Sequence, residues 1–236
     1  MSTIKQRPAL SIILPVLNEA ASLAAQLAEL QSLRASGVEL IVVDGGSSDG
    51  SAALPGPLAD ALLEAPRGRA VQMNAGAGAS TGAVLLFLHA DTMLPPSADR
   101  LVRRALDDGA LWGRFDVRID GAHPLLRIVE RMMNWRSRRT GIATGDQAIF
   151  VRRDLFEAIG GYPEIPLMED IALSKRLRRI ADPACLAEQV TTSGRRWEKH
   201  GVLRTILLMW RLRAEYFLGA DPQRLAARYG YPPRAH

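Results

Sequence analysis

Residues 39–50 read ELIVVDGGSSDG. The consecutive apolar residues of this segment predict a strand over Glu39–Val43 that is buried on both faces. The strand stops at Asp44, and the glycines and serines that follow predict a polar turn with helix-capping residues. Strands that are apolar on both faces need helices on both sides. This segment therefore predicts an inner strand of a parallel α/β sheet.

The same alternation continues on both sides of this segment. Strands are predicted at 10–14, 39–43, 61–64 and 83–88, and helices at 20–33, 69–79 and 97–107. The second half is less regular, with strands predicted at 111–119 and 145–151 and helices at 125–139, 154–159, 168–180 and 202–218. We predict an α/β fold with a Rossmann-like, doubly wound, mostly parallel sheet and a C-terminal helical elaboration. Because there is no internal repeat or low-complexity linker, we expect one domain over 1–236.

Composition excludes several classes of protein. With 47% hydrophobic and 23% charged residues, the 236-residue chain is unlike a disordered or fibrous protein. Its single cysteine, Cys185, excludes an internal disulfide and a cysteine-based zinc cluster. It indicates a reducing compartment, and we expect a cytoplasmic protein. The longest uncharged segment contains a continuous apolar run only over 83–88, which is too short to span a bilayer.

The net charge of +5 is unevenly distributed. Residues 1–100 contain 6 Lys and Arg against 9 Asp and Glu, whereas residues 101–236 contain 24 against 16. A basic C-terminal half favours an anionic partner, such as nucleic acid, phospholipid headgroups or a phosphorylated substrate. Composition does not choose among these partners.

Three polar clusters follow predicted strands. They are Asn18-Glu19, the turn over 44–50, and His89-Ala90-Asp91-Thr92. Each cluster alone is compatible with an ordinary turn, since Asp, Gly and Ser dominate turns. Ligands of open α/β sheets bind beyond the carboxyl ends of the strands, so three such clusters at successive strand ends predict one shared site.

The residue types in these clusters suit a nucleotide and a metal. Asp44 can accept hydrogen bonds from a base or ribose, and Gly45 allows close approach of the backbone. A carboxylate such as Asp91 facing a diphosphate requires a divalent cation between them, Mg²⁺ or Mn²⁺. His89 offers a softer ligand that favours Mn²⁺, or it only hydrogen-bonds the backbone.

The pair Glu169-Asp170 begins a predicted helix. A carboxylate held by backbone donors can act as a general base toward an acceptor hydroxyl. Acids at a helix N-terminus are also common as plain capping residues, and spacing alone favours capping.

Taken in order, these motifs resemble those of family 2 glycosyltransferases, which have the GT-A fold. The motifs are Pro15-x-x-Asn18-Glu19, Asp44-Gly-Gly-Ser-Ser-Asp-Gly50, Gly68-Arg69 with Asn74-x-Gly76, His89-Ala-Asp91-Thr92, Phe150-x-Arg152-Arg153, Gly160-Gly161-Tyr162 and Met168-Glu169-Asp170. The resemblance covers about residues 9–180. The glycine-serine turn and the Leu88-His89-Ala90-Asp91 variant also resemble a small bacterial subgroup named for arsenosugar biosynthesis.

The resemblance implies inverting transfer of a sugar from a UDP- or GDP-linked donor to an acceptor hydroxyl, assisted by Mn²⁺ or Mg²⁺. It implies a donor-binding part over about 9–110, an acceptor and catalytic part over about 111–200, and a C-terminal amphipathic helix over 202–218. The implied nucleotide-sugar-binding residues are Pro15, Asn18, Glu19, Asp44, Gly45, Arg69, Asn74, Ala90, Asp91, Arg195, Arg196 and Trp197. The implied metal ligand is Asp91, and His89 is a further candidate ligand on its own chemistry. The implied acceptor-side residues are Gly145, Asp146 and Gln147, and Asp170 is the implied base with Glu169 in support.

Two departures from the family pattern matter. His89 occupies the first position of the usual aspartate-x-aspartate metal motif, which puts the identity and the need of the metal in question. The Gln-x-x-Arg-Trp motif of processive synthases is absent, and only Gly194-Arg195-Arg196-Trp197 stands near its place. We therefore predict a single transfer, with residues 195–197 either closing over the diphosphate or forming a surface turn.

Arginines are interleaved with apolar residues in the helices predicted at 125–139 and 202–218. This pattern is typical of an interfacial helix or a surface for an acidic acceptor, and equally of an ordinary surface helix. We hypothesise peripheral contact with the inner face of the cell membrane. Competing hypotheses are a nucleotidyltransferase of related fold, which needs a glycine- and lysine-rich loop after the first strand, and a non-enzymatic protein that binds anionic surfaces. No nucleic-acid-binding motif is present.

Overall fold

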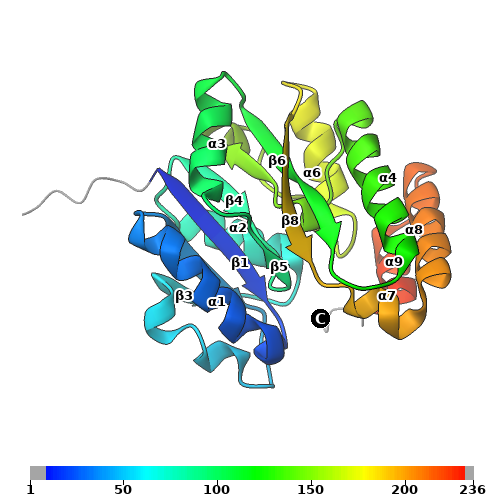
Figure 1. Cartoon of the computed structure of the whole chain (residues 1–236), viewed down its shortest axis with the longest axis horizontal. Coiled ribbons are helices and arrows are strands. Elements are labelled where there is room, and N and C mark those ends of the chain that lie inside the picture. The colour runs from blue at the N-terminus through cyan, green and yellow to red at the C-terminus, as the bar shows by residue number, and fades with distance from the viewer. Residues whose placement is uncertain (1–8, 232–236) are drawn as a thin grey trace, which may run out of the picture.

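The apolar run around Val42 forms an inner strand of an eight-stranded sheet in the computed structural model, which describes residues 9–231 (Figure 1). The sheet has the order β3-β2-β1-β4-β7-β6-β8-β5. Its first four strands are parallel, as predicted: β1 (Leu10–Val16), β2 (Glu39–Asp44), β3 (Ala61–Glu64) and β4 (Val84–Phe87). Every residue of β1 is buried, because β1 lies inside the sheet with helices on both faces.

The other half of the sheet is mixed. Its strands are β5 (Thr92–Met93), β6 (Trp112–Ile119), β7 (Phe150–Arg152) and β8 (Ala184–Thr192). β7 is antiparallel to both β4 and β6, whereas β8 is parallel to β6 and antiparallel to β5. Antiparallel β7 therefore joins the parallel N-terminal sheet to the C-terminal half.

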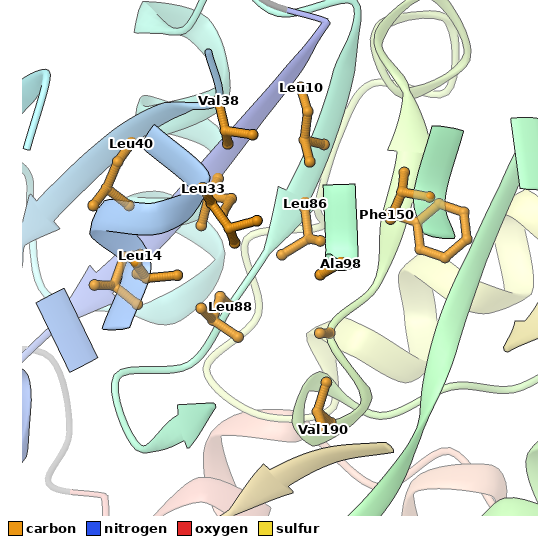
Figure 2. Close-up of a cluster of buried hydrophobic side chains, with 14 of the residues drawn as sticks. Leu10, Leu14, Leu33, Val38, Leu40, Leu86, Leu88, Ala98, Phe150 and Val190 are labelled. Carbon is orange, nitrogen blue, oxygen red and sulfur yellow. The ribbon is translucent and has the colours of Figure 1, made fainter. Parts of the chain in front are cut away.

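Helices cover both faces of the sheet, which confirms the doubly wound prediction. One face carries α1 (Ala20–Ala35) and α3 (Ala98–Asp107), and the other carries α2 (Arg69–Ala79), α5 (Arg153–Ala158) and α6 (Glu169–Arg178). Alternate residues of β1 enter different cores: Leu14 packs in the core of Figure 2, and Ile13 packs in the core under α2. Figure 2 also shows Leu33 of α1 and Leu86 of β4 in the first core.

The remaining helices gather at one edge of the molecule (Figure 1). They are α4 (Pro124–Thr140), α7 (Arg195–His200), α8 (Val202–Phe217) and α9 (Pro222–Tyr229). Leu212 of α8 and Leu225 of α9 pack against Met168 and Ile171 at the start of α6. The C-terminal helices therefore support the segment that carries Glu169 and Asp170.

The predicted strand at 145–151 is wrong over most of its length. Residues Gly145–Gln147 form a 3-10 helix, and only residues 150–152 pair in the sheet as β7. A capping box between Thr144 and Gln147 closes this turn, and Ala148 leaves it with a left-handed φ of 46°. β5, β8, α7 and α9 were not predicted, and the strand predicted at 10–14 continues through Pro15 to Val16.

Candidate functional site

The loops after β1 and β2 are tied to each other by hydrogen bonds. The Asn18 N–H donates to Ser47 Oγ at 2.9 Å, and its side-chain oxygen accepts from the Ser48 N–H at 2.8 Å. The Glu19 N–H donates to Ser51 Oγ at 2.8 Å. Asn18 has a left-handed φ of 55°, which Asn tolerates better than most residues. Two of the three predicted clusters thus form one wall.

Asp44 is buried at the end of β2, with 3% of its surface exposed. Its Oδ2 accepts hydrogen bonds from the N–H groups of Gly46 and Ser47, both at 2.8 Å. Its Oδ1 is buried and has no hydrogen-bond partner within the described part of the chain. Buried carboxylate oxygens are normally satisfied, so Oδ1 is an acceptor suited to a ligand N–H or O–H.

A cavity of about 180 Å³ lies at the carboxyl ends of β1 and β4. Its lining residues are Pro15, Val16, Leu17, Glu19, Arg67, Gly68, Arg69, Gln72, His89, Ala90, Asp91, Pro166 and Tyr231. The structure therefore brings the predicted residues Pro15, Glu19, Arg69, Ala90 and Asp91 together around one space. A second cavity, of about 270 Å³, lies between α1 and residues 92–97 and contains none of the predicted site residues.

Beside this cavity, His89 connects the third cluster to the 3-10 helix at Gly145–Gln147. Nδ1 of His89 lies 3.3 Å from Oδ1 of Asp146. The imidazole ring is 7% exposed and lies directly against Gly145, where an added Cβ would lie 2.3 Å from two ring atoms. Only glycine fits at this position unless the histidine moves.

The same turn holds the predicted base. The Gly145 N–H donates to Oδ2 of Asp170 at 2.8 Å, and Oδ1 accepts from the Ile171 N–H at 2.7 Å. Met168, the residue before the helix, has a left-handed φ of 69°, a strained conformation for a long side chain. Two backbone donors and a strained turn therefore fix the direction of the Asp170 carboxylate.

Burial and mutual repulsion act on the acids of this cleft. Burial raises the pKa of Asp91, and the charge of Asp146 raises it further. Burial also acts to raise the pKa of Asp146, whose side chain is 45% exposed, but the contact with His89 lowers this pKa overall. Asp146 is therefore the carboxylate that stays ionised most readily here.

The pKa values of Glu169 and Asp170 are both raised. For Glu169, which is 4% exposed, burial is the main cause and the charge of Asp170 adds to it, while Arg69 opposes it. For Asp170, burial outweighs its hydrogen bonds from backbone N–H groups, and Asp146 raises its pKa further. A base with a raised pKa is stronger once it is ionised.

The three residues predicted to close over the diphosphate, Arg195, Arg196 and Trp197, lie in different surroundings. Arg195 donates to Oε2 of Glu19 at 3.0 Å, on the cavity wall. Arg196 stacks on the ring of Tyr229, with its Cζ 3.6 Å from the ring centroid. Burial acts to raise the pKa of Asp146, and the positive charge of Arg196 is one of the effects that lower it. Trp197 packs in the cluster around Leu126, away from the cavity lining.

Two other predicted residues make contacts outside the cavity. The Asn74 side chain binds the backbone of Tyr162 through two hydrogen bonds of 2.9 Å, and so holds the loop before α6. Gln147 is fully buried, and its amide contacts Asn134 and Ser137 of α4. Both residues shape the site without lining it.

Sequence reasoning missed several residues of the site, among them Gln72, Tyr231 and Pro166. Gln72 donates to the carbonyl oxygens of Val16 and Val43, both at 2.8 Å, and joins the ends of two strands at the cavity. The sequence pattern that could have identified Gln72 is a polar residue on the otherwise apolar face of a helix. Tyr231 and Pro166 also line the cavity, and no motif marked either of them.

Residues 11–160 match the family model described as glycosyl transferase family 2. The chain belongs to glycosyl transferase family 2. A PGL/p-HBAD biosynthesis glycosyltransferase of Mycobacterium tuberculosis is 34% identical over 173 residues, which are 66% of this chain and 63% of that protein. A protein of the same description from Mycobacterium bovis matches equally well. The family 2 chain thus spans less than two thirds of the length of these relatives.

Solved structures of other proteins share this fold. Staphylococcus aureus TarS in complex with UDP aligns with a TM-score of 0.63 and 15% identity, over 78% of this chain and 60% of that one. The mannosyltransferase PcManGT of Pyrobaculum calidifontis aligns with a TM-score of 0.61 and 21% identity, over 96% of this chain and 70% of that one. The predicted GT-A fold is confirmed.

Glu169→Gln is expected to stabilise the protein at neutral pH. Because the pKa of Glu169 is raised, its ionised form destabilises the folded state, and this effect appears as the pH rises through the raised pKa. At pH 7.5 the variant should therefore have the higher Tm. Near pH 4 the two proteins should have equal Tm values. A lower Tm for the variant at pH 7.5, measured by thermal unfolding, contradicts this account.

Proposed function

We propose that this protein transfers one sugar, with inversion, from a nucleotide-diphosphate sugar to an acceptor hydroxyl. The observation that carries the proposal is the Asp170 carboxylate, which the Gly145 N–H holds beside a cleft that also contains Asp91. The relatives support the class of donor. TarS was crystallised with UDP and with UDP-GlcNAc, and PcManGT with GDP-Man and Mn²⁺.

We place the donor in the cavity with its nucleoside toward the ends of β1 and β2. We assign base or ribose recognition to the unpartnered Oδ1 of Asp44, with Gly45 allowing close approach. Arg69 lines the cavity with its guanidinium 5.7 Å from the ring centroid of Tyr231, and suits the negative diphosphate. Arg195, which binds Glu19 on the wall, supplies a second positive charge at the rim.

A divalent cation, Mn²⁺ or Mg²⁺, fits this site with Asp91 as its ligand. Residues 9–231 contain no group of three or more histidine, cysteine or acidic side chains arranged to hold a metal. One carboxylate together with substrate phosphates is nevertheless a common way to bind Mg²⁺. When bound, the cation would neutralise charge on the leaving diphosphate.

For His89 we propose a positioning role in place of the predicted metal ligation. Its Nδ1 contacts Asp146 and its ring packs against Gly145. Through this packing His89 fixes the turn whose N–H holds Asp170.

Asp170 acts as the general base in the proposed reaction. The acceptor O–H bond breaks and its proton moves to Asp170, while the oxygen forms a bond to the anomeric carbon. The bond from that carbon to the diphosphate breaks, and its electron pair leaves with the nucleoside diphosphate. A single displacement inverts the anomeric configuration. Glu169 supports this role because its charge adds to the acidic field around Asp170.

Several further expectations belong to the same proposal. We expect a single transfer and a cytoplasmic location, and the two motif variants support a place in the arsenosugar-named bacterial subgroup. A nucleotidyltransferase is less well supported, since the loop after β1 lacks glycine and lysine and its backbone binds Ser47 and Ser51.

Asp170→Asn is expected to abolish transfer while keeping the donor bound. Asn is nearly isosteric and can still accept a backbone hydrogen bond, but it cannot take a proton at neutral pH. Donor turnover should fall about 10³-fold or more, with the Kd for UDP or GDP nearly unchanged. Turnover of the variant at the wild-type rate contradicts the assignment of Asp170 as base.

Asp91→Ala is expected to remove the metal-dependent part of donor binding. A thermal-shift screen of UDP-, GDP- and dTDP-sugars, with and without Mn²⁺, identifies the donor because a ligand that binds the native state raises its Tm. A ligand at 100 times its Kd stabilises by about 2.7 kcal/mol. Asp107→Ala, an exposed acid at the end of α3, is the control and should keep the Mn²⁺-dependent shift. An unchanged Mn²⁺-dependent shift in Asp91→Ala contradicts the metal assignment.

A further inference from the structure

Helices α4 and α8 expose large apolar side chains that the proposed function does not use. On α4 these are Ile128, Met132 and Trp135, and on α8 they are Leu203, Leu207 and Trp210. Each is between 48% and 65% exposed. The spacing is i, i+4 and i+7 in both helices, which places each set in one stripe along its helix.

The two stripes lie next to each other. α4 and α8 run side by side at the edge of the molecule (Figure 1), and Val129 of α4 packs with Ile206 of α8 in a small shared cluster. On the helical wheel, each stripe lies between the side that faces the other helix and a row of arginines. The rows are Arg127, Arg131 and Arg138 on α4 and Arg204 and Arg211 on α8. We call the two stripes and their arginine margins the α4/α8 face.

The α4/α8 face carries a net positive charge. The only acid of α4 is Glu130, which is buried and paired with Arg127, and the only acid of α8 is Glu215, which binds Arg211 and Arg228. Arg131 and Arg204 have no ion pair with any residue of the described chain. Their charges are therefore available to a partner.

We propose that the α4/α8 face docks on the surface of an anionic lipid bilayer. An apolar centre containing two tryptophans, with arginines along its margins, matches the acyl and headgroup layers of such a surface. A second copy of this chain fits less well, because a two-fold dimer would bring two positive faces together. None of the helices in the described part of the chain has both the length and the apolar character that crossing a bilayer requires.

Helix α8 of the α4/α8 face also packs against the segment that carries the proposed base. Leu212 of α8 packs against Met168 and Ile171, which flank Glu169 and Asp170. Arg136 lies on the side of α4 toward α8. Burial lowers the pKa of Arg136, and the negative charge of Asp170 acts in the opposite direction. The proposed base therefore lies behind the docking face, whereas the β1 and β2 loops of the donor cavity belong to the other half of the sheet.

Vesicle flotation tests this proposal with the full chain. Wild type should float with vesicles of phosphatidylcholine and phosphatidylglycerol at low salt, and much less with phosphatidylcholine alone or at high salt. Arg131→Gln with Arg204→Gln should weaken binding about 30-fold, because each arginine near an anionic surface contributes about fivefold. Trp135→Ser with Trp210→Ser should weaken it at least as much.

Matched controls lie elsewhere on the surface. Ile180→Ser removes an apolar side chain that is 54% exposed in the turn after α6, and Arg103→Gln removes an exposed arginine of α3. Both should bind vesicles like wild type, and unchanged thermal unfolding should show that all variants fold. The proposal is overturned if wild type ignores anionic vesicles, if it binds neutral vesicles equally well, if the paired variants bind like wild type, or if sedimentation velocity finds a dimer that the tryptophan variants dissolve.

Discussion

The contact between the imidazole of His89 and the bare α-carbon of Gly145 is the constraint on which the site depends. His89 follows β4 in the donor-side half, and Gly145 begins the 3-10 turn in the other half. Because no side chain intervenes, the turn lies close enough for Asp146 to reach Nδ1 of His89. The N–H of that same glycine holds Asp170. One packing contact thus relates the proposed base to the donor cavity.

The buried carboxylates of the site are unfavourable in their ionised forms. Burial raises the pKa values of Asp91, Glu169 and Asp170, which means that their ionised forms are poorly solvated in the absence of a ligand. Met168 adds backbone strain directly before the two acids. Such concentrations of charge and strain are typical of functional sites, where the surrounding fold over-determines an arrangement that is unfavourable locally. Here the C-terminal helices pack on Met168 and hold it in place.

Local chemistry explains which parts were predictable from the sequence. Apolar runs and helical periodicity predict the parallel strands and the bounds of α2. The polar clusters were recognised as one site because the carboxyl ends of parallel strands meet at the same edge of a sheet. By contrast, the apolar residues of β8 end after 184–187, and polar residues without alternation make up most of the rest of the strand. The turn at 145–147 depends on a capping box inside a segment of strand-like composition. Tyr231 lines the cavity beside Tyr229, whose ring contacts Arg196. These residues are far apart in the sequence, and no local sequence pattern predicts that they meet. Helix capping and general-base catalysis both place acidic residues at the start of a helix such as α6, so only the family resemblance distinguished between these two roles.

The turnover number of Gly145→Ala measures how far the site depends on the contact between His89 and Gly145. An added methyl group must displace the His89 ring or move the turn, and a displacement of about 1 Å at a catalytic group costs about 100-fold in rate. Gly78→Ala, at an exposed helical glycine with open space around it, controls for the substitution itself. We expect a loss of about 100-fold in kcat for Gly145→Ala and none for Gly78→Ala. A kcat for Gly145→Ala within twofold of wild type, measured at saturating donor, would contradict it.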